Sequence, residues 1–213
     1  MAILVNNRVR GQTLFKTIYF IPSIIPIVAA SLLWMWLLNA KYGLINFILG
    51  KLHLYQPGWL VDPRWTKISL LLLGMWGAGG IMVIFVAALQ DVPRNLYEAA
   101  EIEGASSLHK FFYITLPSIS PVIFFQVLMG VIAHLQYFTQ AYMMLTTNQT
   151  SAASGGPENS MLFYAMYLYY NGFQYLKMGK ASAMAWILFV ISSLITLAIF
   201  RSSNRWVFYG GGE

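Results

Sequence analysis

The most chemically distinctive stretch of the sequence is DVPRNLYEAAEIEGASSLHKFFYITLP, residues 91–117. Glu98, Glu101 and Glu103 make it acidic in a chain whose formal net charge is +6. Between these glutamates, Ala99 and Ala100 leave a surface with little side-chain bulk. A low-profile acidic helix suits docking into the cleft of a partner protein.

A second group of polar side chains lies in a charge-free stretch, residues 111–157. Polar groups inside a bilayer are costly and usually face a protein interior or a water-filled path. One interpretation is a lining that exchanges hydrogen bonds with the hydroxyl groups of a solute while aromatic rings stack on its flat faces. The other is hydrogen bonding between helices. The candidates are Gln126, His134, Gln136, Tyr137, Gln140 and Tyr142.

Nothing in the sequence indicates enzyme chemistry. The chain has no cysteine, and no second histidine or carboxylate shares the apolar segment of His134, so we expect no metal and no cofactor. Gly179–Ser182 faintly resembles a phosphate-binding loop, but Gln174 stands where the leading glycine should be. The sequence therefore predicts no nucleotide site in this chain.

Long apolar runs must position these residues. Hydrophobic residues make up 58% of the 213 positions and charged residues only 9%, and a helix needs about 20 apolar residues to cross a bilayer. The tyrosine-rich stretch Met161–Leu176 is too short and polar, and we expect an extracytoplasmic interfacial helix there. The predicted fold is an all-α membrane protein with about four transmembrane helices, at about Thr17–Leu38, Ile68–Leu89, Ile119–Leu145 and Ala181–Phe200.

The basic charge balance does not indicate nucleic-acid binding. The 13 Lys and Arg residues stand singly between apolar runs, a pattern typical of membrane flanks, so membrane lipid is the expected contact. Four spans place both termini and the acidic loop, residues 90–118, on one side. That side carries seven basic residues and the other six, which leaves the orientation nearly undecided.

The acidic loop is predicted to hold two short helices. Pro93 suits a first helical turn, and Gly104 is a natural helix stop because glycine tolerates positive φ. Ser106 or Ser107 could then cap a second helix running toward Leu116 and Pro117.

These residues resemble the loop of the inner-membrane permeases of ABC importers, which reads Glu-Ala-Ala, three residues, Gly, nine residues, Ile, one residue, Leu-Pro. All seven fixed positions and both spacings match. The resemblance implies a cytoplasmic coupling helix that sits in a groove of an ATPase subunit, and a multi-pass protein of a bacterial or archaeal cytoplasmic membrane. The implied coupling residues are Glu98, Ala99, Ala100, Glu103, Gly104, Ile114, Leu116 and Pro117.

Other stretches are similar to sugar-importer permeases. The resemblance implies an ATPase dimer, a second homologous permease and an extracytoplasmic solute-binding protein as partners. It also implies one transmembrane domain over residues 1–213 that lacks two N-terminal spans, since members commonly have six. The similar stretches are Phe15–Pro26, Trp36–Asn46, Gly155–Pro157, Phe173–Ala183 and Arg205–Glu213.

Two other function classes stay open. An ion-coupled secondary transporter would also carry polar residues in its spans, but all seven Asp and Glu residues lie outside the predicted spans, which argues against it. A non-transporting truncated membrane protein or scaffold is the second alternative. Co-purification with an ATPase subunit distinguishes it from a permease.

Overall fold

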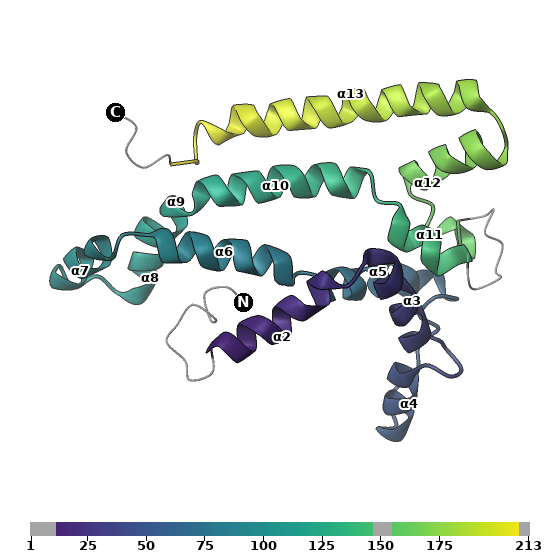
Figure 1. The fold of residues 1–213 in the computed structure, drawn as a ribbon, viewed down its shortest axis with the longest axis horizontal. Helices are drawn as coiled ribbons and strands as arrows, with labels where there is room; N and C mark the ends of the chain where they lie inside the picture. Colours follow the sequence, from purple (N-terminus) through teal and green to yellow (C-terminus); the bar gives the residue numbers. More distant parts are fainter. Residues whose placement is uncertain (1–11, 147–154, 209–213) are drawn as a thin grey trace. The chain divides into compact units, whose positions relative to one another are not determined.

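Proline and glycine decide where many of the helices of this protein end. The computed structural model describes residues 12–146 and 155–208, and these residues form no strand. Parts of the expected domain, residues 1–11, 147–154 and 209–213, lie outside the described residues. The longer helices (Figure 1) are α2 Gln12–Ile24, α3 Ile27–Leu37, α4 Leu44–Lys51, α5 Pro63–Trp76, α6 Gly79–Asp91, α7 Arg94–Ile102, α10 Ser120–Leu135, α11 Thr139–Thr146 and α13 Met178–Ser203.

Short helical segments connect the longer helices. Two of them are π-helices, in which the backbone bonding shifts by one residue. In chain order they are α8 Ser107–Lys110, the π-helix Phe111–Thr115, α9 Leu116–Ser118, the 3-10 turn Pro157–Asn159, α12 Tyr164–Tyr169 and the π-helix Tyr170–Gln174.

The helices confirm the predicted membrane fold. Two stretches are each long and apolar enough to cross a bilayer: Ser120–Leu145, which covers α10 and nearly all of α11, and Met178–Ser203, which is α13. Two pairs, α2 with α3 and α5 with α6, meet the same test jointly but bend by more than 40° at short breaks. Pro26 precedes α3 and cannot continue the bonding of α2. If each bent pair is one span, the described residues hold four spans.

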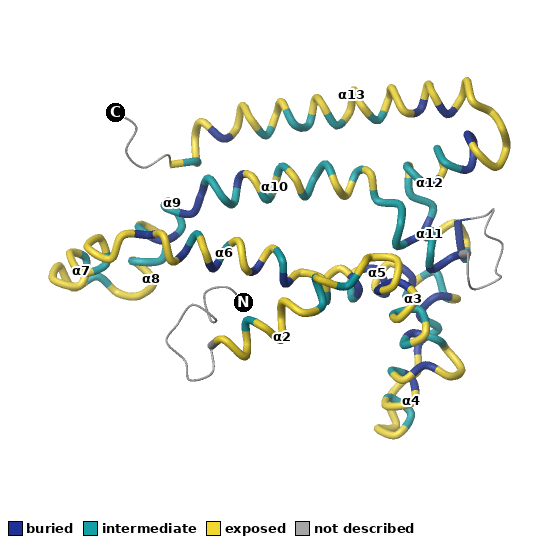
Figure 2. The backbone as a smooth tube through the Cα atoms, in the orientation of Figure 1, coloured by how far each residue is buried: buried dark blue, intermediate teal, exposed yellow. Residues whose placement is uncertain are grey.

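Large apolar side chains face outward along these helices. On α13, Trp186 is 69% exposed and Leu197 64% exposed, and the tube of α13 is mostly exposed in Figure 2. So much apolar surface would be unfavourable in water. Hydrocarbon or another membrane subunit is the environment that suits it.

The chain divides into two compact units. One unit comprises residues 1–22, 78–132 and 192–213, and the other comprises residues 23–77 and 133–191. The first unit holds the acidic loop and the second holds most of the polar candidates of the charge-free stretch.

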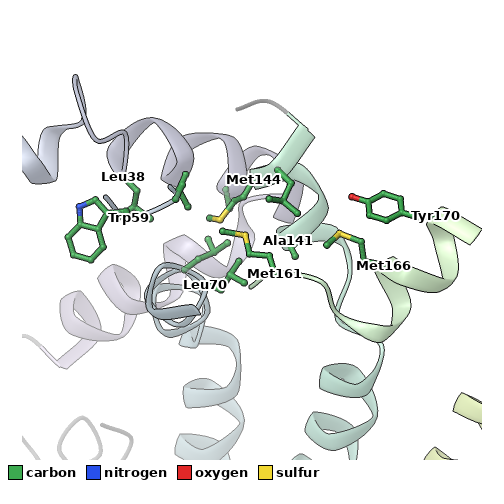
Figure 3. Packing of buried hydrophobic residues seen from close by; sticks show 12 residues of the cluster. Leu38, Trp59, Leu70, Ala141, Met144, Met161, Met166 and Tyr170 are labelled. Atoms are coloured by element: carbon green, nitrogen blue, oxygen red, sulfur yellow. The ribbon is translucent and has the colours of Figure 1, made fainter. Parts of the chain in front are cut away.

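The core of the second unit is built mainly by α3, α5, α11 and the segment around α12. Leu38, Met144 and Met161 are fully buried, and Figure 3 shows the side chains of both methionines in this core. Tyr170 is 1% exposed, so the tyrosine-rich stretch contributes to the core as well as to the surface.

A buried asparagine ties together the segment between α3 and α5. Asn46 is 4% exposed, and its amide nitrogen donates to the carbonyl oxygens of Ala40 at 3.1 Å and Pro57 at 3.0 Å. Its amide oxygen accepts the indole N–H of Trp59 at 2.8 Å. Every part of this amide is paired, so the segment has a defined shape.

We expect Asn46→Ala to destabilise the second unit. The indole N–H of Trp59 and two backbone carbonyls would lose their partners in a buried site, at a cost of about 2 to 3 kcal/mol. The measurement is thermal unfolding of the chain in detergent, followed by tryptophan fluorescence. Gln56→Ala is the control, because Gln56 is an exposed amide on the same segment. Equal melting temperatures for the two variants would contradict this role of Asn46.

Candidate functional site

The helix of the acidic loop ends at the glycine that the sequence indicates. Gly104 has a φ of +73°. The Gly104 N–H donates to the carbonyl of Glu101 at 3.0 Å, and the Ala105 N–H donates to the carbonyl of Ala100 at 2.9 Å. This pair of bonds is the Schellman motif, which pairs the last carbonyls of a helix and requires a left-handed residue. The predicted helix stop is confirmed.

A serine cap starts the next helix. The hydroxyl of Ser106 accepts the N–H of His109 at 3.3 Å, so Ser106 is the cap of the two candidates. The ring of His109 stacks on Tyr113, with ring centroids 4.2 Å apart. The turn between α7 and α8 is therefore defined by its own hydrogen bonds.

The carboxylates of α7 differ in their partners. Glu98, Glu101 and Glu103 are all exposed. Glu101 forms an ion pair with Lys110 at 2.8 Å, and this is the one ion pair found within residues 12–146 and 155–208. Glu98 and Glu103 are thus presented on the surface next to the exposed Ala99 and the half-buried Ala100.

The later part of the motif faces inward. Ile114 packs against Leu89, Val92 and Ile119 at the end of α6 and the start of α10. Leu116 and Pro117 are half-buried in α9. The predicted coupling residues thus fall into an exposed outer group, with Glu98 and Gly104, and an inner group that fastens the loop to the spans.

Tyr97 is an anchor that sequence reasoning missed. Its hydroxyl lies 2.7 Å from the hydroxyl oxygen of Thr115. Its ring packs against the same cluster as Ile114 does, formed by Leu89, Val92 and Ile119. Thr115 is buried and also contacts the carbonyl of Lys110 at 3.4 Å. A tyrosine one position before Glu98 could have indicated this anchor, but its partner is 18 residues away.

We expect Tyr97→Phe to loosen the acidic loop while leaving the spans intact. The variant keeps the ring contacts and removes one hydroxyl hydrogen bond, worth about 0.5 to 1.5 kcal/mol. Limited proteolysis of the chain in lipid nanodiscs should show faster cleavage within residues 94–110. Tyr113→Phe is the control, because Tyr113 is exposed. Equal cleavage rates in the two variants would contradict the anchor.

The polar candidates of the charge-free stretch are distributed over α10, α11 and the connection between them, which holds Gln136 and Tyr137. Gln126 lies on α10 with intermediate exposure, in the first unit, and the other five lie in the second unit. His134 and Gln136 are exposed near the end of α10, and the His134 ring stacks parallel to Tyr137 with centroids 6.4 Å apart. Gln140 and Tyr142 are half-buried on α11. The polar-lining interpretation and the helix-bonding interpretation both remain predictions.

An aromatic cluster accompanies these residues. Tyr137 meets Phe163 edge-on at 5.0 Å, and Phe138 stacks on Tyr142 at 5.0 Å. Tyr169 contacts Phe138 and Tyr142 at 5.1 Å and 5.3 Å. Sequence reasoning named only Tyr137 and Tyr142 as candidates of this site. Phe163 and Tyr169 come from α12 and its approach, and Phe138, next to Tyr137, has no polar group that would mark it. All five rings are half-buried and pack against the core of the second unit.

Lys180 is tied to α12. Its ammonium donates to the hydroxyl of Tyr167 at 2.8 Å and lies 4.7 Å from the centre of that ring. The hydrogen bond and the positive charge of Lys180 lower the pKa of Tyr167 from its ordinary value. The contact fixes the start of α13 against α12.

The sequence matches one protein-family model and is similar to permease proteins of known bacteria. The family model described as "Binding-protein-dependent transport system inner membrane component" matches residues 1–208. The chain is 38% identical over 215 residues to the Probable ABC transporter permease protein YesP of Bacillus subtilis (strain 168), covering 100% of this chain and 67% of that protein. It is 32% identical over 202 residues to the sulfoquinovosyl glycerol transport system permease protein SmoG of Agrobacterium fabrum, covering 94% of this chain and 63% of SmoG.

A solved structure shares the fold. A chain of a bacterial ABC transporter involved in the import of the acidic polysaccharide alginate matches with a TM-score of 0.83 at 22% identity. The match covers 96% of this chain and 70% of that chain. The chain therefore spans about two thirds of the length of the proteins it resembles.

Proposed function

Because the chain belongs to the family of binding-protein-dependent transport system inner membrane components, we propose that it is the permease subunit of an ATP-driven ABC importer and that residues 90–118 couple it to an ATPase. The chain is a multi-pass membrane protein of this family. One observation carries the coupling proposal: the loop presents Glu98 and Glu103 outward while Ile114 fastens it to the spans.

The proposed substrate class is a sugar or other carbohydrate. SmoG is named for the transport of a glycoside, and the aromatic cluster around Tyr137 and Tyr142 offers rings that can stack on sugar faces. Gln126, His134, Gln136 and Gln140 are the proposed hydrogen-bonding partners of hydroxyl groups along the path. The proposed partners are an ATPase dimer, a second homologous permease and an extracytoplasmic solute-binding protein.

The proposed mechanism is alternating access without bond chemistry in this chain. ATP binding closes the ATPase dimer, and α7 moves together with the ATPase groove in which it sits. The spans then reopen toward the loaded binding protein. A partner shifts such an equilibrium only by its different affinity for the two states. The loop must therefore stay engaged throughout and pass its displacement to α6 and α10, which the Ile114 packing and the Tyr97–Thr115 contact support.

Capture of the ATPase tests the proposal. The chain is co-expressed with an ABC importer ATPase from the same genome, and the membrane complex is purified through a tag on the chain. We expect the double variant Glu98→Lys, Glu103→Lys to lose the ATPase, because it reverses two outer-group charges that form no ion pair with any other described residue. Glu101→Gln is the control, because Glu101 is already paired with Lys110. Absence of any ATPase with the wild-type chain would favour the non-transporting scaffold.

A further inference from the structure

Two prolines weaken the backbone where the acidic loop enters α10. Pro117 and Pro121 have no N–H, so the carbonyls of Tyr113 and Pro117 lose the donors that a regular α-helix would supply. The backbone departs from α-helix on both sides of Pro117. Phe111–Thr115 is a π-helix, and Ile119 has φ −92° and ψ 1° between α9 and α10. The junction is a helical connection that lacks two α-helical hydrogen bonds, and the Pro117 carbonyl is reached by the nearby N–H of Ile119 instead.

Ser120 replaces one of these bonds. Its hydroxyl donates to the carbonyl oxygen of Pro117 at 2.6 Å, the acceptor that Pro121 cannot serve. The same hydroxyl oxygen accepts the backbone N–H of Phe208 at 2.8 Å. Ser120 is 4% exposed, so water competes little for either bond. A serine at the junction thereby links the acidic loop to a segment 88 residues later in the chain.

The segment that supplies this N–H is itself held on α10. The Trp206 ring meets Phe124 edge-on at 6.1 Å, and Phe124 meets Phe200 edge-on at 5.1 Å. Ser203 is buried and shapes the turn after α13, because its carbonyl accepts the Val207 N–H at 2.9 Å. Residues 203–208 are called the C-terminal strap below.

We infer that the C-terminal strap is a positioning element which, through Ser120, fixes the angle at which the acidic loop joins α10. The effect of the strap on transport rests on the proposed function. If the ATPase displaces α7, the displacement reaches α10 only when the junction between them is stiff. Two missing backbone bonds make this junction compliant, and the strap restores its stiffness. Loss of the strap should let the loop follow the ATPase while α10 lags, so that ATP is hydrolysed without transport.

A backbone substitution can remove the strap bond while leaving Ser120 in place. Phe208→Pro deletes the donated N–H, whereas Phe208→Ala keeps it, and the Phe208 side chain is 59% exposed. The alanine variant therefore serves as the matched control for loss of the ring. Ser120→Ala removes both hydroxyl bonds, and Ser120→Thr restores a hydroxyl.

Hydrogen–deuterium exchange of the full chain in lipid nanodiscs tests the strap without any partner. We expect Ser120→Ala and Phe208→Pro to raise exchange in residues 111–119 by about two- to tenfold, the effect of one lost hydrogen bond on local opening. Phe208→Ala and Ser120→Thr should stay near wild type. The double variant Ser120→Ala, Phe208→Pro should exchange little faster than Ser120→Ala, because Ser120→Ala already removes the bond to the Phe208 N–H. Unchanged exchange in both single variants overturns the inference.

A second measurement addresses coupling in the assembled transporter. In proteoliposomes with the ATPase, the partner permease and the binding protein, Phe208→Pro should raise the ATP hydrolysed per substrate imported at least about twofold over Phe208→Ala. A merely structural role would lower both rates together and leave this ratio unchanged, which would overturn the positioning role. A wild-type assembly that imports nothing contradicts the proposed function, and the exchange result then decides on the strap alone.

Discussion

Replacing Gly79 with valine is expected to prevent the chain from folding into a stable, monodisperse form. Gly79 begins α6 and is buried against the backbone of α2. A Cβ at this position would overlap the carbonyl oxygen of Tyr19 and lie 2.8 Å from its carbonyl carbon and 3.0 Å from the Cα of Phe20. The neighbours are backbone atoms, which cannot rotate away as a side chain can. We expect a cost of at least about 3 kcal/mol.

Gly74→Val is the matched control. Gly74 lies in α5, and a Cβ added there meets nothing within 4 Å. Both variants carry the same β-branched side chain in a helix of a predicted span. The difference between their melting temperatures therefore reports on the contact between α2 and α6. Size-exclusion chromatography and thermal unfolding in detergent provide the measurement. If Gly79→Val elutes and melts like Gly74→Val, then α2 does not approach α6 as closely as the structure shows.

The crossing at Gly79 illustrates what could not be predicted from the sequence. The predicted span Ile68–Leu89 contains Gly74, Gly77, Gly79 and Gly80, and small residues permit close contact between helices in a membrane. Which of these glycines contacts another helix depends on the path of α2. That path is set by the packing of the folded chain and not by the local sequence. The same holds for Tyr170, whose residue type favours the membrane interface but which is 1% exposed in the structure. Hydropathy predicts spans well because length and apolarity alone satisfy the bilayer.

Local features of the acidic loop were predictable for a different reason. The helix stop at Gly104 and the cap at Ser106 depend on backbone conformation and on hydrogen bonds within a few residues. The bond from Phe208 to Ser120 was not predictable, because a serine and a backbone N–H carry no pairing signal across 88 residues. Pro117 and Pro121 do indicate a weakened junction, but the partner that supports it is visible only in the structure.

Replacing Gly104 with aspartate is expected to abolish transport while leaving membrane insertion intact. A Cβ at Gly104 meets open space among the described residues, so no internal clash opposes the change. The φ of +73° does oppose it, because a non-glycine residue pays about 1 to 2 kcal/mol in the left-handed region. Aspartate also adds a negative charge at the C-terminal end of α7, beside Glu101 and Glu103, where the helix dipole disfavours anions.

Gly104→Asn separates the two causes, because asparagine has the size of aspartate without its charge and tolerates the left-handed region. We expect Asn to retain part of the uptake activity and Asp to retain none, measured as import of labelled substrate by the assembled transporter. Membrane fractions should contain both variants at the wild-type level, since the loop lies outside the spans. Equal loss in both variants would assign the effect to the backbone of the Schellman motif, and undiminished uptake in Gly104→Asp would show that the turn after α7 has no part in coupling.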